Sequence, residues 1–425
     1  MGFRTNAHNL NLNRDYMKAE TPEMQALLAL FGAWDPVVYV DLHTTDGAKF
    51  EPDVSVLVDP AREPRDDRLD EAAAGLSAAL QRRLSALGHL PLDFYPSFLK
   101  NDDPSSGFAA AIATPRFSDA YAAARNRLGV LIETHSWKTY AQRVHATHDV
   151  LVALFERARE DAAAWRAACD DADTRSASLA GHEVPLAFEH SEAARSIEFR
   201  GYAYERKLSE ISGQTWIRYD ERRPQIWRVP FYETLKPTVV VRAPRAGYVI
   251  PAGWAALVGE RLARHHIQFR TLSAAANLAV ETFRASAVTL DEPFEGRTGA
   301  RVQGIWRPER RAVAPGSLFV PIAQARARLI LHLLEPTGPD SLVSWGFMNA
   351  VFEQKEYMEA YVTEEEARKM LAREPKIKRE FEARLAADPG FAKDPKKRLA
   401  FFWERHPSWD EQKNLIPIFR IDRAP

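Results

Sequence analysis

The sequence predicts an α/β protein with a mixed, mostly parallel sheet between helices, followed by a β-rich module and a helical C-terminal tail. Three observations support this prediction. Strand-like and helical segments alternate in residues 1–172, short aromatic and β-branched runs follow one another in residues 183–346, and charged helical periodicity fills residues 347–425. Alternating strands and helices are typical of a sheet covered on both faces, whereas closely spaced strands are typical of a β-sandwich-like module.

Composition narrows the possible functions. The 425 residues correspond to two or three domains of about 150 residues each. Lys and Arg number 57 and Asp and Glu 58, a net charge of −1, so the whole chain gives no reason to expect a nucleic-acid or anionic-membrane partner. No apolar run approaches the roughly 18 residues of a transmembrane segment. Cys169 is the only cysteine, which excludes an internal disulfide and a cysteine-based zinc site.

In the first part, two short apolar runs rich in β-branched residues, Val37–His43 and Leu128–Glu133, end in polar residues. Such runs are typical of buried strands that lead into a turn. Alternation of apolar and polar residues predicts a further strand at Glu51–Val58. Helical spacing predicts helices at residues 67–87, 118–125 and 140–171.

A change in composition near Asp170–His182 indicates a boundary, because Asp, Ser, Thr and Gly accumulate there. Beyond it we expect one helix at Trp254–His265 among many short strands. The expected strands lie at residues 197–208, 215–219, 226–232, 238–243, 247–251, 279–290, 300–306, 317–322 and 327–334. From Val351 to Trp409 the pattern is helical and charged.

Two polar side chains follow the apolar strands of the first sheet, His43 after one and Glu133 after the other. In open α/β sheets, ligands bind outside the carboxyl ends of the strands. Imidazole is a common zinc ligand, and a carboxylate beside a metal can accept a proton from bound water. The pair therefore suggests metal-assisted hydrolysis. The alternative is structural: His43 bonds to backbone and Glu133 caps the next element.

Upstream of His43, Arg14 stands among asparagines in Asn9-Leu-Asn-Leu-Asn-Arg-Asp15. Its guanidinium offers a fork of donors that suits a carboxylate. The alternative is a helix-start motif in which Asn13 or Asp15 caps the following residues.

Four segments together resemble the bacterial zinc carboxypeptidases of the carboxypeptidase A type. They are Asn9-Leu-Asn-Leu-Asn-Arg-Asp15, Trp34-Asp-Pro36, Val40-Asp-Leu-His-Thr-Thr-Asp-Gly47, and Leu131-Ile-Glu-Thr-His-Ser-Trp137 with Arg143-Val144. The resemblance covers roughly residues 1–155, and their order is more specific than any one segment. The later segments Leu333-Leu-Glu-Pro336, Trp345-Gly-Phe347 and His406-Pro-Ser-Trp-Asp410 look like the C-terminal extension of larger bacterial members.

The resemblance implies a role for each of four residues. His43 would be the last of three zinc ligands, and Glu133 the general base that activates zinc-bound water and then protonates the leaving amine. Asn13 and Arg14 would hold the free C-terminal carboxylate of a peptide substrate. The catalytic-cleft tyrosine of the family has no match: Tyr121 is too deep in its helical pattern, and the nearby Arg116 is a polar candidate without an assigned role.

The chain departs from the family pattern at its beginning. The first two zinc ligands of the family lie in a His-x-x-Glu motif well upstream of the Asn-Arg pair, which here begins at residue 13. We therefore expect a chain that lacks its N-terminal part, with weak or absent zinc binding and little activity. A lost N-terminal part could have carried a signal peptide, which would place the protein in the periplasm or outside the cell.

Two other segments could supply zinc ligands, and neither is favoured. His332-Leu-Leu-Glu335 spells the missing motif, but in the strand expected at 327–334 residues three apart point to opposite faces. His145 and His148 share a face of the helix expected at 140–171, where surface histidines are common.

Two other functions stay open. One is an amidase or deacylase on the same fold type, acting on a small acylated amino acid that also carries a carboxylate. The other is a non-catalytic peptide- or glycan-binding protein that uses aromatic side chains of the β-rich module. The candidates for that surface are Trp216, Tyr219, Trp227 and Tyr232.

Overall fold

The computed structural model describes residues 3–45, 47–60 and 68–425. The first residue of the helix expected at 67–87 and Asp46 of the motif at 40–47 lie outside this part. The first sheet has four strands in the order β1-β5-β2-β3. Its members are β1 (Val38–Thr45), β5 (Leu128–His135), β2 (Val54–Asp59) and β3 (Pro91–Leu92). β1 is parallel to β5, β5 antiparallel to β2, and β2 parallel to β3, so the sheet is mixed.

Helices cover this sheet. Helices α2 (Arg68–Ala86) and α4 (Tyr140–Ala177) pack on one face, where Val and Ile side chains of β2 and β5 form a core with leucines of α2. Short helix α3 (Ser118–Ala124) contacts β1, β5 and β2. A Cβ at Gly129 would lie 2.3 Å from the Asp119 backbone oxygen, so glycine permits the close approach of α3 to β5. Helix α1 (Pro22–Trp34) precedes β1.

The β-rich module contains a six-stranded antiparallel sheet in the order β11-β14-β10-β15-β12-β13. These strands are β11 (Arg270–Thr271), β14 (Leu318–Pro321), β10 (Gly247–Ile250), β15 (Leu415–Ile421), β12 (Ala276–Phe294) and β13 (Arg297–Val313). Helices α5 (Ala252–Arg264) and α6 (Ala327–Leu334) contribute apolar side chains to a core shared with this sheet. A pair, β6 (Glu183–His190) with β9 (Leu235–Arg242), joins the same core.

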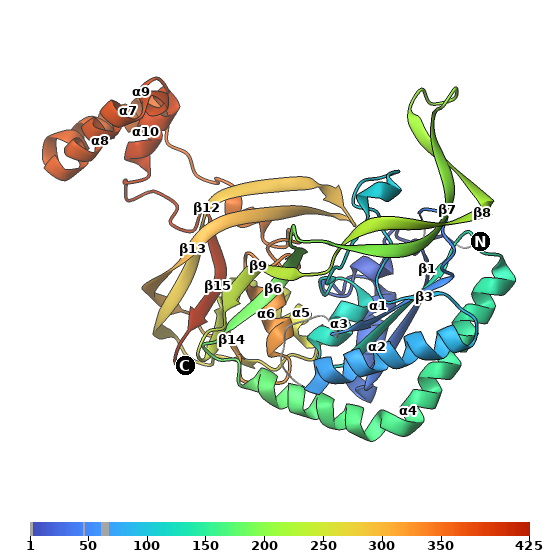
Figure 1. The fold of residues 1–425 in the computed structure, drawn as a ribbon. Coiled ribbons are helices and arrows are strands. Elements are labelled where there is room, and N and C mark those ends of the chain that lie inside the picture. Colours follow the sequence, from blue (N-terminus) through green and yellow to red (C-terminus); the bar gives the residue numbers. More distant parts are fainter. Residues whose placement is uncertain (1–2, 46, 61–67) are drawn as a thin grey trace.

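A long hairpin of the module reaches over the first sheet (Figure 1). It consists of β7 (Arg195–Leu208) and β8 (Thr215–Tyr232), and β8 also pairs with β4 (Phe108–Ala109). Phe50, next to β2 in the chain, bridges to Gly201 of β7. The hairpin therefore brings residues of the module beside loops of the first sheet.

The C-terminal region differs from a wholly helical tail. Helices α7 (Ala360–Arg373), α8 (Pro375–Ala387), α9 (Pro389–Ala392) and α10 (Pro395–Trp403) pack around their own small phenylalanine-rich core. After them, β15 returns to lie between β10 and β12, and all of its residues are buried. The seven-residue run Leu-Ile-Pro-Ile-Phe-Arg-Ile is short and almost wholly apolar, as a central strand requires.

Two further predictions about elements are wrong. Residues 327–334, expected as a strand, form helix α6. Its apolar residues are buried all round, and a short apolar run of this kind does not distinguish a buried strand from a buried helix. The two strands expected at 215–219 and 226–232 are one strand, β8, which continues through Pro224.

The first sheet and the module share one hydrophobic core. Its side chains come from α1 and the segment before it, from α3, and from the module. His265, directly after α5, is fully buried there. Its Nε2 lies 3.1 Å from the Met17 carbonyl oxygen and its Nδ1 lies 2.9 Å from the Tyr121 hydroxyl. A carbonyl can only accept, so Nε2 carries the proton and Nδ1 accepts from Tyr121. Burial lowers the pKa of His265 to about 3.

This buried imidazole predicts acid sensitivity of the shared core. Below pH of about 6.5 the unfolded chain binds a proton that the folded chain does not, so His265 reduces the free energy of unfolding as the pH falls. In a His265→Gln variant, which keeps a donor and an acceptor, this contribution is absent. We expect the stability advantage of the wild type over the variant to shrink by about 1.5–2 kcal/mol between pH 6.5 and pH 5. Urea unfolding at both pH values measures the free energy of unfolding of the two proteins. A difference between wild type and variant that does not change with pH would contradict a buried neutral imidazole.

Candidate functional site

His43 and Glu133 lie side by side on neighbouring strands. The parallel register of β1 and β5 pairs His43 directly with Glu133. Residues paired in this way point to the same face of a sheet. On the other side of β5, antiparallel β2 pairs Ser55 with Glu133. Glu133 is therefore in the middle of the sheet and 8% exposed, whereas His43 is partly exposed.

Asp41 orients the His43 ring. The two residues stand two apart on β1 and therefore share a face, and Asp41 Oδ2 lies 2.7 Å from His43 Nε2. This hydrogen bond raises the pKa of His43, and the charges of Asp41 and Glu133 add to the effect. Burial alone would raise the pKa of Asp41, but its hydrogen bonds with His43 and Ser118 outweigh burial and lower it. The sequence pattern of alternate residues on a strand could have identified Asp41.

Asn13 is held next to His43. It lies in the single 3₁₀ turn η1 (Leu12–Arg14), whose N-terminal end is capped by the Asn11 side chain. The Asn13 Oδ1 accepts a hydrogen bond from the Ser118 backbone N–H at 2.9 Å, and its Nδ2 lies 3.4 Å from His43 Nε2. The asparagine thus connects the start of α3 to the end of β1.

Arg14 is a half-buried cation beside this group. Its guanidinium stacks on the Phe117 ring at 4.2 Å and donates a 2.6 Å hydrogen bond to the Asn13 carbonyl oxygen. Among the residues that the structure describes, no carboxylate lies within the 4.0 Å of an ion pair with Arg14. Burial lowers the pKa of Arg14 and the positive charge of Arg4 lowers it further, whereas the charge of Glu295 acts in the opposite direction.

Asp119 is a second carboxyl group near Asp41. It is 4% exposed at the start of α3. Burial raises its pKa, and the charge of Asp41 raises it further. A carboxyl group with a raised pKa beside an ionised one can hold a proton that the ionised one does not.

Catalytic zinc requires three protein ligands and an open position. His43 is one possible ligand. Within the described ranges, no group of three or more His, Cys, Asp or Glu residues is positioned to hold a metal ion. The described side chains around His43 therefore do not make a complete zinc site.

Several of the other candidate ligands contact carboxylates or cations elsewhere in the fold. On α4, His148 Nδ1 lies 2.9 Å and His145 Nε2 lies 3.6 Å from Asp149, which also contacts His89. Glu335, beyond the end of α6, is fully buried and holds Arg420 through Oε2 at 2.6 Å. The strand expected at 327–334 is a helix, so the argument from strand geometry against His332 and Glu335 is wrong; the Glu335 carboxylate is nevertheless occupied by its ion pair with Arg420.

Two further residues of the sequence analysis have structural partners. The Tyr121 hydroxyl is buried against His265, away from any surface. Arg116, left unassigned, donates from Nε to Asp340 Oδ1 at 2.6 Å and stacks on Trp345 at 4.8 Å. It joins the first sheet to the module.

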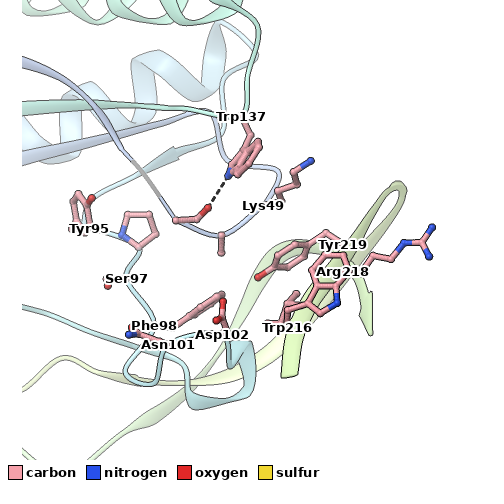
Figure 2. Close-up of a pocket in the computed structure, with 14 residues that line it drawn as sticks. Lys49, Tyr95, Ser97, Phe98, Asn101, Asp102, Trp137, Trp216, Arg218 and Tyr219 are labelled. Atoms are coloured by element: carbon pink, nitrogen blue, oxygen red, sulfur yellow. Dashed lines mark hydrogen bonds between the residues drawn. The ribbon is translucent and has the colours of Figure 1, made fainter. Parts of the chain in front are cut away.

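An aromatic cleft lies just beyond the carboxyl ends of β1 and β5 (Figure 2). Its walls include Trp137, which follows β5, Trp216 and Tyr219 of β8, and Tyr95. Of the four aromatic residues expected to form a binding surface, Trp216 and Tyr219 line this cleft. Trp227 is buried in the core beneath the hairpin, and Tyr232 lies at the far end of β8. The sequence reasoning missed Trp137 and Tyr95 because nothing local predicts that a distant hairpin covers them.

Comparison with known proteins gives no relative: no family model, curated protein or solved structure matches the chain. The four residues expected to share a site nevertheless have defined positions. Asn13, Arg14, His43 and Glu133 belong to three segments that meet at the β1–β5 edge of the first sheet. No helix in the described part of the chain is long and apolar enough to cross a membrane.

The contact between Asp41 and His43 predicts a measurable pKa. In an Asp41→Asn variant the hydrogen-bonded charge is lost while burial remains, so the pKa of His43 should fall below its ordinary value. Histidine ring signals followed by NMR during a pH titration measure it. His89 is the internal control: burial lowers its pKa, but Asp53 and Asp149 outweigh burial, and neither changes in the variant. An unchanged pKa of His43 would contradict the role of Asp41.

Proposed function

We propose that the chain binds the free C-terminal carboxylate of peptides and hydrolyses the last peptide bond, in the manner of a metallocarboxypeptidase. The observation that carries the proposal is Arg14, a half-buried guanidinium with no described carboxylate in ion-pair range, which directly follows Asn13, the residue whose side chain contacts His43. A guanidinium is suited to recognise the terminal carboxylate that marks the C-terminal end of a peptide.

Arg14 and Asn13 are suited to hold the substrate. The guanidinium can offer two parallel N–H donors to a carboxylate, which fixes its plane as well as its position. Stacking on Phe117 and the bond to the Asn13 carbonyl reduce the side-chain entropy that binding would cost. Asn13 connects the two groups, because its backbone carbonyl accepts from Arg14 and its side-chain Nδ2 lies 3.4 Å from His43 Nε2.

Glu133 is suited to move the proton. It is 8% exposed and belongs to the central strand, so its carboxylate is held by rigid backbone rather than by a loop. As a general base it would take a proton from the attacking water and return it to the leaving amine.

Of the four proposed site residues, only His43 would be a zinc ligand. When bound, zinc would polarise the scissile carbonyl and acidify water. No group of three such ligands lies among the described residues, so we propose weak zinc binding and slow hydrolysis for this chain.

Removing the guanidinium tests the carboxylate site. The wild-type chain should bind a peptide with a free C-terminus about tenfold to a hundredfold more tightly than the same peptide with an amidated C-terminus, as charge-assisted hydrogen bonds predict. In Arg14→Ala this preference should disappear, and Arg14→Lys, which keeps the charge without the fork, should retain part of it. Isothermal titration calorimetry measures both peptides.

The matched control for this experiment is Arg228→Ala on β8. Arg228 is a strongly exposed arginine whose partner, Glu198, is also exposed, so its loss should leave both affinities unchanged. Equal binding of the free and amidated peptides by the wild type would refute the carboxylate site, because the terminal charge would then contribute nothing to the affinity.

Replacing the proposed base separates chemistry from binding. Glu133→Gln should lower hydrolysis of C-terminal residues in zinc-containing buffer by about 10²–10⁴-fold, because the proton acceptor is lost. Affinity for the free-acid peptide and the zinc content by elemental analysis should stay the same, since neither depends on the base. Hydrolysis that persists at the wild-type rate would mean that Glu133 is not the base.

A further inference from the structure

The aromatic cleft beside the candidate site has a volume of about 660 Å³ and opens to solvent (Figure 2). Two tryptophan side chains in its wall are well exposed, Trp137 at 55% and Trp216 at 44%. Exposed aromatic faces gathered around a hollow are typical of a binding site rather than of ordinary surface. Trp137 is fixed by a 2.7 Å hydrogen bond from its Nε1 to the Gly47 carbonyl oxygen.

The cleft is next to the proposed carboxylate site. Its wall includes Tyr95, whose hydroxyl lies 3.3 Å from the Thr45 hydroxyl at the end of β1, two residues after His43. On the other strand, Trp137 follows Glu133 by four residues. The two strands that carry His43 and Glu133 therefore both end at this cleft, where ligands of α/β sheets bind.

The module supplies the opposite wall through the edge of β8. Four consecutive residues, 216–219, line the cleft. Neighbouring side chains of a strand point to opposite faces, so a cavity touched by four in a row meets the strand along its edge. One edge of β8 pairs with β7, and the other pairs with β4 at Phe231 and Tyr232 only, within the described residues. The strand therefore has an open edge along this stretch.

An open strand edge beside aromatic side chains favours one class of ligand. An extended peptide can add to such an edge through its main-chain N–H and C=O groups while its side chains occupy neighbouring pockets. A glycan could stack on the tryptophans but has no backbone to complete the strand. Lys49, which stacks on Trp137 at 4.5 Å and pairs with Glu221 of β8, connects the two walls.

We propose that this cleft binds the residues that precede the C-terminal residue of a peptide, extended along β8, with an aromatic side chain against Trp216 and Trp137. The inference rests on the proposed function and specifies its substrate class. The chain would act on peptides of several residues that carry an aromatic residue upstream, in preference to dipeptides.

Three free-acid peptides test this preference by calorimetry on the full chain: Phe-Gly-Phe-Gly-Ala-Ala, Gly-Gly-Gly-Gly-Ala-Ala and the dipeptide Ala-Ala. The wild type should bind the aromatic hexapeptide about tenfold more tightly than the glycine hexapeptide, as aromatic stacking predicts. Trp216→Ala should remove most of this factor without changing the affinity for Ala-Ala. Trp216→Phe, which keeps an aromatic face, should retain most of it and exclude a folding defect.

The control variant is Trp34→Ala. Trp34 is the last residue of α1, is 78% exposed and does not line the cleft, so its loss should change none of the three affinities. Equal affinities for both hexapeptides, or a preference that survives Trp216→Ala, would overturn the inference. So would binding of chitohexaose that Trp216→Ala abolishes while the peptides show no preference, because the cleft would then be a glycan site.

An amidated form of the aromatic hexapeptide separates this inference from the proposed function. If the amide binds as tightly as the free acid and both lose affinity in Trp216→Ala, the cleft binds peptides and the carboxylate site fails. If the free acid is preferred but the aromatic residues add nothing, the carboxylate site holds and the inference about the cleft is wrong.

Discussion

The in-register parallel pairing of β1 with β5 is the constraint on which the candidate site depends. It puts His43 and Glu133 on one face of the sheet and leaves both strands ending at the same cleft. A shift of one residue in either strand would turn the side chains of that strand to the opposite face. Antiparallel β2 beyond β5, and the close approach of α3 at Gly129, hold this register from both sides.

The second constraint is the segment that carries Asn13 and Arg14, which is anchored by the module rather than by the sheet alone. The Asn11 backbone N–H donates to Glu295 Oε2 at 2.8 Å, and the buried Lys18 ammonium donates to the Glu295 carbonyl at 2.7 Å. Glu295 lies in the turn between β12 and β13. The module thus holds the segment that carries Asn13 and Arg14 through one hairpin and forms a wall of the neighbouring cleft through another. This gives the module a physical role in the proposed activity.

Local patterns predicted much of the fold. Apolar strands bounded by polar residues, and the helices α2, α3, α4 and α5, lie close to their expected positions because their burial and capping are encoded nearby. The sequence did not reveal that β15 crosses back into the module sheet or that residues 327–334 are helical, since both depend on distant partners. In the site, the strand ends at His43 and Glu133 could be predicted locally. The lack of an ion-pair partner for Arg14 among the described residues, and the cleft at Trp216, depend on how separate segments meet.

A crystal structure of the full chain with Phe-Gly-Phe-Gly-Ala-Ala bound as the free acid tests the central claim most directly. The account predicts the terminal carboxylate within hydrogen-bonding distance of the Arg14 guanidinium, the last peptide bond beside Glu133, and the aromatic residues against Trp216. A terminal carboxylate bound elsewhere, with no peptide near Arg14, would contradict the proposed role of Arg14.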